Sequence, residues 1–148
     1  MCLPLDPDWG THFNGHQWSG YIAGVEYDGV DGVGNVFDER NAGGGLRNKP
    51  TPCAVCYIER ASVLMIPAKQ QCPDGWIKEY DGYLVSEFTA GQNRHRSNYA
   101  CWDRAPEIAT GGIDYNHALI YPVEAICGTL PCSTYPNYKE LTCVVCSK

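Results

Sequence analysis

The sequence has little positive charge and no long apolar segment. Its 11 lysines and arginines are outnumbered by 17 aspartates and glutamates, and the net charge is −6 at pH 7. The densest basic cluster is the short run Arg94-His95-Arg96. Phosphate binding needs a concentrated basic face, so we expect no nucleic-acid partner. No apolar stretch approaches the ~20 residues of a membrane span, so we expect no membrane insertion either.

Motifs of catalysis and processing are also missing. The N-terminus has neither the basic nor the apolar region of a signal peptide, and we expect a mature or trimmed secreted protein. The pattern Asn-x-Ser/Thr is absent, so N-glycosylation is not expected. The sequence contains no His-Glu-x-x-His, no Gly-x-Ser-x-Gly and no Gly-rich phosphate loop. We therefore predict a protein that is not an enzyme and that carries no cofactor.

Cysteine, glycine and proline are abundant. The 148 residues include nine cysteines, 16 glycines and ten prolines, which is typical of a loop-rich single domain (residues 1–148) reinforced by disulfides. Each disulfide adds roughly 2–4 kcal/mol of stability, chiefly by restricting the unfolded chain. Eight cysteines are expected to form structural disulfides, although spacing cannot give their connectivity: Cys53, Cys56, Cys72, Cys101, Cys127, Cys132, Cys143 and Cys146.

Cys2 is the ninth cysteine and is left over from this set. Three fates stay open for it: a partner lost from the N-terminal side, a disulfide to another chain, or a free thiol. We predict that it is unpaired within the chain and that its partner is missing or intermolecular.

Two Cys-x-x-Cys pairs, at 53–56 and 143–146, also fit a four-thiolate zinc site. Zinc knuckles usually lie much closer in sequence, and an extracellular setting favours oxidation, so we predict disulfides and no metal. A thioredoxin-like centre would need the pair to open a helix after a strand, whereas both pairs lie in β-like segments. Nucleophilic catalysis would need a free thiol beside an imidazole, and Cys2 has no preorganised partner.

The apolar pattern indicates β-structure almost throughout. The longest apolar run, 62–68, is β-branched in part and ends near Pro67, and a second apolar segment, 141–146, is expected beside it in one cross-linked core. We expect strands at 17–27, 53–59, 62–68, 76–88, 118–127 and 141–146. The segment 76–88 is either one long strand or a strand pair turning at Asp81-Gly82. Only 101–108 could hold a turn of helix.

These segments predict an all-β fold: a small disulfide-rich β-sandwich or barrel-like domain with long loops. A long, flexible, exposed loop is expected at 40–52. Residues 28–39 contain Asp28, Asp31, Asp38 and Glu39 among glycines, a composition that suits either a calcium loop or ordinary Asp-Gly turns. Because the spacing follows no known calcium pattern, we favour turns.

Surface recognition is the function that the composition favours. Ten tyrosines and four tryptophans exceed the needs of a small core, and rings flanked by polar side chains suit sugars. Single aromatic residues in β-proteins more often belong to the core. Polar and aromatic residues cluster at 93–103 and 114–117, and from these we predict five ligand contacts: His95, Arg96, Tyr99, Asp103 and Asn116.

The order of the motifs adds a resemblance that covers nearly the whole chain. The motifs include Pro52-Cys-Ala-Val-Cys56, Cys72-Pro-x-Gly-Trp76, Arg96-Ser-x-Tyr99-x-Cys101, Cys127-Gly-x-Leu-Pro-Cys132 and Glu140-Leu-Thr-Cys143-Val-Val-Cys146-Ser-Lys148. In this order they resemble the globular module of short-chain collagen C4-like proteins, which are extracellular proteins of marine invertebrates. Some marine invertebrate lectins look similar to that module.

The resemblance implies carbohydrate binding and brings no catalytic residues. Relatives usually carry a further segment with an additional cysteine before the Cys-Leu-Pro motif, which would supply a partner for Cys2. No Gly-X-Y repeat is present, so a collagen triple helix is not part of this polypeptide. We predict a secreted, lectin-like protein that binds glycans and becomes multivalent by forming a homo-oligomer. The alternative is an extracellular-matrix assembly module that contacts a partner chain.

Overall fold

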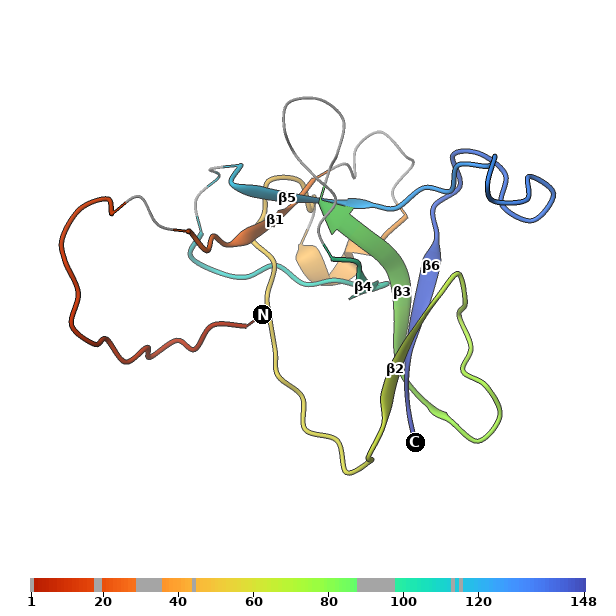
Figure 1. Cartoon of the computed structure of the whole chain (residues 1–148), viewed down its shortest axis with the longest axis horizontal. Helices are drawn as coiled ribbons and strands as arrows, with labels where there is room; N and C mark the ends of the chain where they lie inside the picture. Colours follow the sequence, from red (N-terminus) through yellow and green to blue (C-terminus); the bar gives the residue numbers. More distant parts are fainter. Residues whose placement is uncertain are drawn as a thin grey trace.

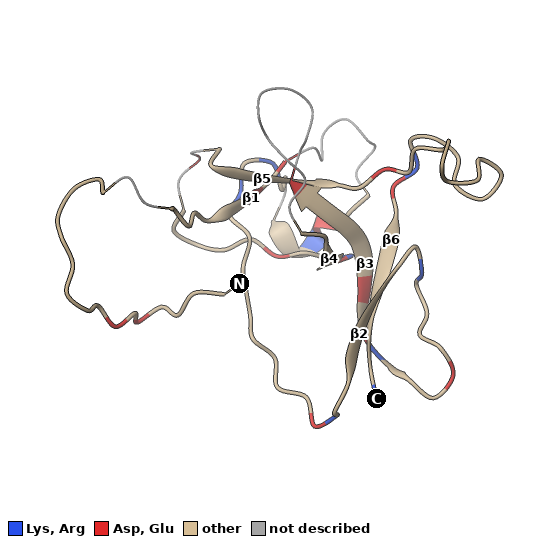
Figure 2. Ribbon diagram, viewed as in Figure 1, with Lys and Arg blue, Asp and Glu red and all other residues tan. Residues whose placement is uncertain are grey.

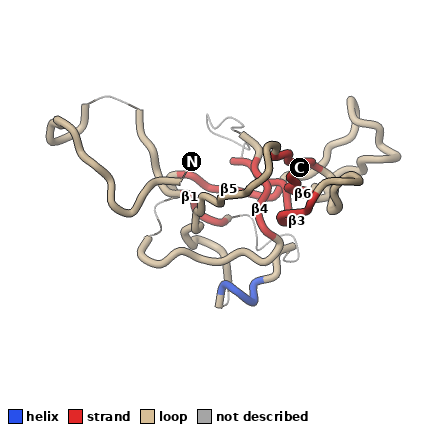
Figure 3. Tube along the Cα trace, turned by 90° about the horizontal axis from the view of Figure 1, so that it is seen from below, coloured by secondary structure: helices blue, strands red, loops and turns tan. Residues whose placement is uncertain are grey.

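The computed structural model describes residues 2–17, 20–28, 36–43, 45–87, 98–112, 114 and 116–148. Within them the protein is almost all-β, as predicted, with one short 3-10 helix, η1 (Glu39–Ala42). The strands are β1 (Val25–Tyr27), β2 (Val63–Pro67), β3 (Ile77–Glu87), β4 (Ala100–Asp103), β5 (Ala118–Pro122) and β6 (Thr142–Ser147). Figures 1 and 3 show the strands gathered centrally, with long loops projecting outward.

The described strands form one six-stranded mixed sheet in the order β1-β5-β3-β6-β2, with β4 paired to β3. Only the β1–β5 pair is parallel among these described strands. The strand β3 is the centre of the arrangement, because it pairs with β4, β5 and β6. The Leu84 N–H donates to Leu141 O and the Leu84 carbonyl accepts from Val123 N–H, each at 2.8 Å. The N–H and the carbonyl of Leu84 point to the same side of β3. The chain segments of β5 and β6 therefore lie one after the other along that edge of β3, and β4 pairs with the opposite edge.

The predicted pairing of the two apolar segments is confirmed. Strand β2 runs antiparallel to β6 in a register that extends from Val63 opposite Ser147 to Pro67 opposite Cys143. The Ala68 N–H donates to Thr142 O at 2.7 Å, so the backbone nitrogen of the preceding residue, Pro67, faces the open side of β2. Proline lacks a donor there, which is tolerated only at such an edge.

One long strand is the correct alternative for 76–88, and a turn at Asp81-Gly82 is wrong. Gly82 lies buried in the middle of β3, opposite Asp103 of β4. A Cβ at this position would overlap the carbonyl oxygen of Trp102 and lie 2.8 Å from Arg104 N. The glycine therefore serves the close approach of β4 rather than a reversal of the chain.

Four disulfides cross-link the chain: Cys2–Cys53, Cys72–Cys146, Cys101–Cys143 and Cys127–Cys132. The prediction that Cys2 lacks a partner in the chain is wrong, because the extended N-terminal segment brings it to Cys53. The prediction that Cys56 forms a structural disulfide is also wrong, because Cys56 is the free, exposed cysteine. Three of the four cysteines in the two Cys-x-x-Cys pairs are bonded elsewhere, so they do not form a zinc site.

The core lies on both faces of β3, because successive residues of a strand point to opposite sides. Val85 packs with Tyr27, Phe37, Ala42 and Leu46 on one face. On the other face, Leu84 packs with the disulfide-bonded Cys101 and Cys143. Most described residues of the loop expected at 40–52 are exposed, but Ala42 and Leu46, which is 0% exposed, anchor it in the core.

Several predicted elements are shorter or absent. Within 17–27 only β1 is a described strand, and residues 53–59 are extended and mostly exposed without pairing in the sheet. The helical turn expected at 101–108 is instead the end of β4 followed by irregular chain. None of the described helices is long and apolar enough to cross a membrane.

Candidate functional site

The five residues predicted as ligand contacts do not form one cluster in the structure. His95 and Arg96 lie outside the described residues. Tyr99 immediately precedes β4 and lines one cavity, whereas Asp103 ends β4 and lines another. Asn116 lines neither cavity, and its side-chain amide donates to Asp114 at 2.9 Å. Of the described three, only Asp103 therefore lies among several aromatic residues at a cavity.

The cavity at Asp103 has a volume of about 510 Å³ and lies along β4. We call it the β4 cavity. Its lining comes from β1, β3 and β4, from the extended segment 51–56, from Asn41 and from residues 105–107. The aromatic residues in its lining are Tyr27, Tyr80 and Trp102. The sheet thus gathers three rings from distant parts of the sequence at one hollow.

Hydrogen bonds and ring packing fix these aromatic side chains. The Tyr27 hydroxyl donates to Glu107 O at 2.7 Å, and the Tyr80 hydroxyl donates to Cys101 O at 2.9 Å. The ring of Tyr27 meets that of Trp102 edge to face, with 4.6 Å between centroids. A ligand would meet the partly exposed rings of Tyr80 and Trp102, already held in place, so little side-chain entropy would be lost on binding.

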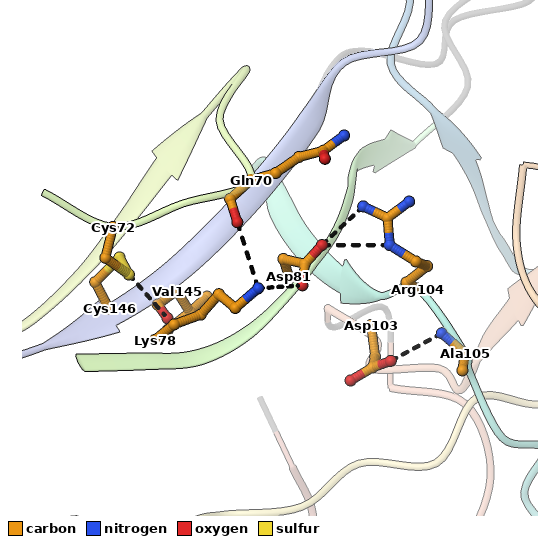
Figure 4. A network of polar contacts seen from close by, with 9 residues as sticks. All are labelled: Gln70, Cys72, Lys78, Asp81, Asp103, Arg104, Ala105, Val145 and Cys146. Atoms are coloured by element: carbon orange, nitrogen blue, oxygen red, sulfur yellow. Dashed lines mark hydrogen bonds and ion pairs between the residues drawn. A yellow bond between two sulfur atoms is a disulfide. The ribbon is translucent and has the colours of Figure 1, made fainter. Parts of the chain in front are cut away.

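Carboxylates and an amide lie at the same cavity. Asp103 and Glu107 are exposed, as is Asn41, whose side-chain amide donates to Ala105 O at 3.2 Å. The Asp103 carboxylate accepts a hydrogen bond from the Ala105 N–H at 2.8 Å (Figure 4). The polar rim therefore offers acceptors and a donor beside the rings.

The carboxylates also act on the neighbouring phenols. Burial, with smaller contributions from Glu107 and Asp103, raises the pKa of Tyr27 to about 12. Burial, followed by the charges of Asp103 and Cys56, raises the pKa of Tyr80. Both hydroxyls thus stay protonated at physiological pH and keep their hydrogen bonds to the Glu107 and Cys101 carbonyls.

A charged network anchors the end of β4 that carries Asp103. Asp81 of β3 accepts from Lys78 at 2.9 Å and from the Arg104 guanidinium at 2.7 Å (Figure 4). These hydrogen bonds, that from Arg104 first, lower the pKa of Asp81. The Arg104 N–H also donates to Asp81 O at 3.1 Å. Asp103 therefore lies between Trp102, whose carbonyl oxygen closely approaches Gly82, and Arg104, which is ion-paired to Asp81.

A second cavity of about 520 Å³ lies where β3, β5 and the segment 123–130 meet. We call it the β5 cavity. Tyr99 and Tyr121 belong to its lining, but most of its remaining surface is aliphatic. The separation of Tyr99 from Asp103 follows from β4 itself, because Tyr99 precedes the strand and Asp103 is its last residue.

The carboxylates of the proposed turn region 28–39 have partners where they are described. Asp28 accepts from the Tyr121 hydroxyl at 2.7 Å, and Asp38 pairs with Arg40. The hydrogen bonds from Arg40 lower the pKa of Asp38 to about 2. Asp31 lies outside the described residues. No group of three or more His, Cys, Asp or Glu residues that could hold a metal occurs among the residues that the structure describes.

Charged side chains are dispersed over the described chain. Figure 2 shows Lys and Arg at separate places on loops and strands, interspersed with Asp and Glu. Asp103 and Glu107 border the β4 cavity, and no described Lys or Arg lines it.

Sequence reasoning missed Tyr27, Asn41 and Glu107. They reach the β4 cavity only through tertiary structure, since the hydrogen bond from Tyr27 to Glu107 spans 80 residues. The adjacent pair Trp102-Asp103 was the one local signal of this site.

The chain matches no protein-family model, no curated protein and no solved structure. The resemblance to short-chain collagen C4-like modules rests on the ordered sequence motifs alone.

Proposed function

We propose that the protein is a secreted, non-enzymatic carbohydrate-binding protein of the short-chain collagen C4-like kind, and that the β4 cavity binds the sugar. The observation that carries the proposal is the joining of Tyr27, Tyr80 and Trp102 with Asp103 and Glu107 around one hollow of about 510 Å³. Aromatic surface suits the C–H face of a sugar ring, and carboxylates are strong acceptors for its hydroxyl groups.

The cavity also supports a neutral ligand rather than an anionic one. The described charged residues that line it are Asp103 and Glu107, both acidic. Sugars without acidic substituents are therefore the favoured class, because a carboxylate or sulfate would be repelled. Single sugar sites are weak, and linking several through self-association raises the avidity.

An assembly role in the extracellular matrix is the second candidate, and exposed apolar side chains support it. Leu5 is fully exposed, Trp9 is 80% exposed and Phe13 is 78% exposed on the N-terminal segment. Val55 and Tyr57, each 87% exposed, lie on the segment 51–62. The Cys2–Cys53 disulfide ties the two segments together beside the sheet (Figure 1). Apolar groups displayed in this number suit a protein partner.

A glycan array with Asp103→Asn as the test variant examines the sugar proposal. The exchange keeps an oxygen for the Ala105 N–H but removes the charge, and we expect affinity to fall about tenfold, or ~1.4 kcal/mol. Glu59→Gln is the matched control, because Glu59 is exposed and does not line the cavity. Absence of binding to every neutral glycan at high protein density would reject the lectin function.

Sedimentation velocity tests the assembly candidate separately. Replacing Leu5 and Tyr57 by serine should convert an oligomer into a monomer while leaving glycan binding per site unchanged. A wild-type protein that stays monomeric at high concentration would reject self-association through these segments.

A further inference from the structure

Ser86 on β3 is a buried hydroxyl without a hydrogen-bond partner among the described residues. Its residue is 6% exposed and its Oγ atom is almost completely buried. Buried polar groups in folded proteins are nearly always paired, since an unpaired one has lost its hydrogen bonds to water. An orphaned hydroxyl in the lining of a cavity therefore points to a ligand that bonds to it.

The surroundings of Ser86 define an apolar chamber, the β5 cavity of about 520 Å³. Leu84 lies two residues earlier on the same face of β3, and Val123 and Leu141 continue the wall. Tyr121 lies opposite Ser86 in the β3–β5 register, but its hydroxyl donates to Asp28 at 2.7 Å. The phenol that lies nearest in the register thus directs its proton away from Ser86.

The charged residues that line this cavity are acidic. Of the described residues that line it, the charged ones are Glu87 and Glu124. Thr129 and Leu130, from the loop closed by the Cys127–Cys132 disulfide, complete the lining. An anionic ligand such as a fatty acid would meet two carboxylates and no lining cation, so the lining disfavours anions.

We propose that the β5 cavity binds a neutral, mainly apolar small molecule that carries one hydroxyl, amide or carbonyl group. The apolar body packs on Leu84, Val123 and Leu141, and the polar group hydrogen-bonds to Ser86. The cavity is separate from the β4 cavity, and the two share no lining residue. Tests of this proposal are therefore independent of whether the β4 cavity binds a sugar.

Three probes of nearly equal shape test the proposal: 2-naphthalenemethanol, 2-methylnaphthalene and 2-naphthoate. We expect the alcohol to bind best, the methyl compound about tenfold more weakly and the carboxylate not at all, with backbone NMR shifts centred on β3 and β5. The factor of ten corresponds to about 1.4 kcal/mol for the hydrogen bond. Equal binding of all three, or shifts centred elsewhere, would overturn the assignment.

Ser86→Ala separates the hydroxyl from the rest of the cavity. It should reduce the affinity for the alcohol to that of the methyl compound and leave the methyl compound unaffected. Ser62→Ala is the matched control, because Ser62 is exposed and lies outside the cavity. The thermal midpoint of unliganded Ser86→Ala should equal or exceed that of the wild type, because no internal hydrogen bond is lost. A clear fall would mean that the protein itself satisfies the hydroxyl, and the proposal would be wrong.

Two further variants examine access and charge. Thr129→Trp, in an exposed loop, should abolish binding of the alcohol and the methyl compound alike by filling the cavity mouth. Combined Glu87→Gln and Glu124→Gln should allow 2-naphthoate to bind. Retention of alcohol binding in Thr129→Trp, or continued exclusion of the carboxylate after both carboxylates are removed, would contradict this description of the cavity.

Discussion

Gly82→Ala should destabilise the protein strongly, because no side chain fits between β3 and β4. The added Cβ would overlap the Trp102 carbonyl oxygen and lie 2.8 Å from Arg104 N. Relief requires β4 to move away, although the Cys101–Cys143 disulfide holds that strand to β6. Loss of two or three interstrand hydrogen bonds, each ~1 kcal/mol, and of part of the Trp102 packing amounts to about 3–5 kcal/mol.

Thermal unfolding monitored by circular dichroism measures this effect. For a domain of this size ~1 kcal/mol corresponds to about 3–4 °C, so the midpoint should fall by roughly 9–20 °C. Gly24→Ala is the control, because a Cβ there would meet nothing within 4 Å, and its midpoint should stay unchanged or rise slightly. Equal midpoints for the two variants would refute the close approach of β4 to β3.

Three other predictions concern sulfur and ionisation. Titration with a thiol reagent under denaturing, unreduced conditions should find one thiol per chain in the wild type and none in Cys56→Ser; two or more thiols would contradict the four disulfides. Asp81→Asn should lower the free energy of unfolding by about 1–2 kcal/mol at neutral pH, whereas Asp8→Asn, at an exposed site, should not. Since hydrogen bonds from Arg104 and then Lys78 lower the pKa of folded Asp81, its contribution is lost as pH falls through that pKa, and the difference from wild type should vanish in acid. Because the pKa of Tyr27 is raised to about 12, its stabilising effect is complete below pH ~10 and is lost as pH rises toward 12; ultraviolet titration of Tyr27→Phe should lack the latest phenolate step.

The elements that were predictable from sequence are those with a strong local pattern. The runs at 62–68 and 141–146 are apolar and partly β-branched, and they pair as β2 and β6. Local patterns failed where a residue serves a distant contact. Asp81-Gly82 has the composition of a hairpin turn. In the structure, however, Asp81 forms ion pairs with Lys78 and Arg104, and Gly82 allows the close approach of β4.

Disulfide connectivity and the candidate site depended on tertiary structure. Nothing local distinguishes Cys53 from Cys56, yet only Cys53 meets Cys2. Asp103 was chosen for its polar and aromatic neighbours in sequence, and the structure places it beside rings from other strands. Asn116 was chosen on the same grounds, but its side-chain amide hydrogen-bonds to Asp114 and it lines neither cavity. Local composition identifies residues that could contact a ligand, whereas strand pairing decides which of those residues meet at one cavity.

The Cys2–Cys53 disulfide closes a covalent ring around the N-terminal third of the chain. Trp9, Phe13 and Tyr21 are exposed within that ring and are natural cleavage sites for a chymotrypsin-like protease. A cut after any of them would add one water to the intact mass but would release no peptide, because the cleaved piece stays attached through Cys2. A single cut would thus open this segment without removing it, and release of the N-terminal piece that contains Cys2 would require a reductant.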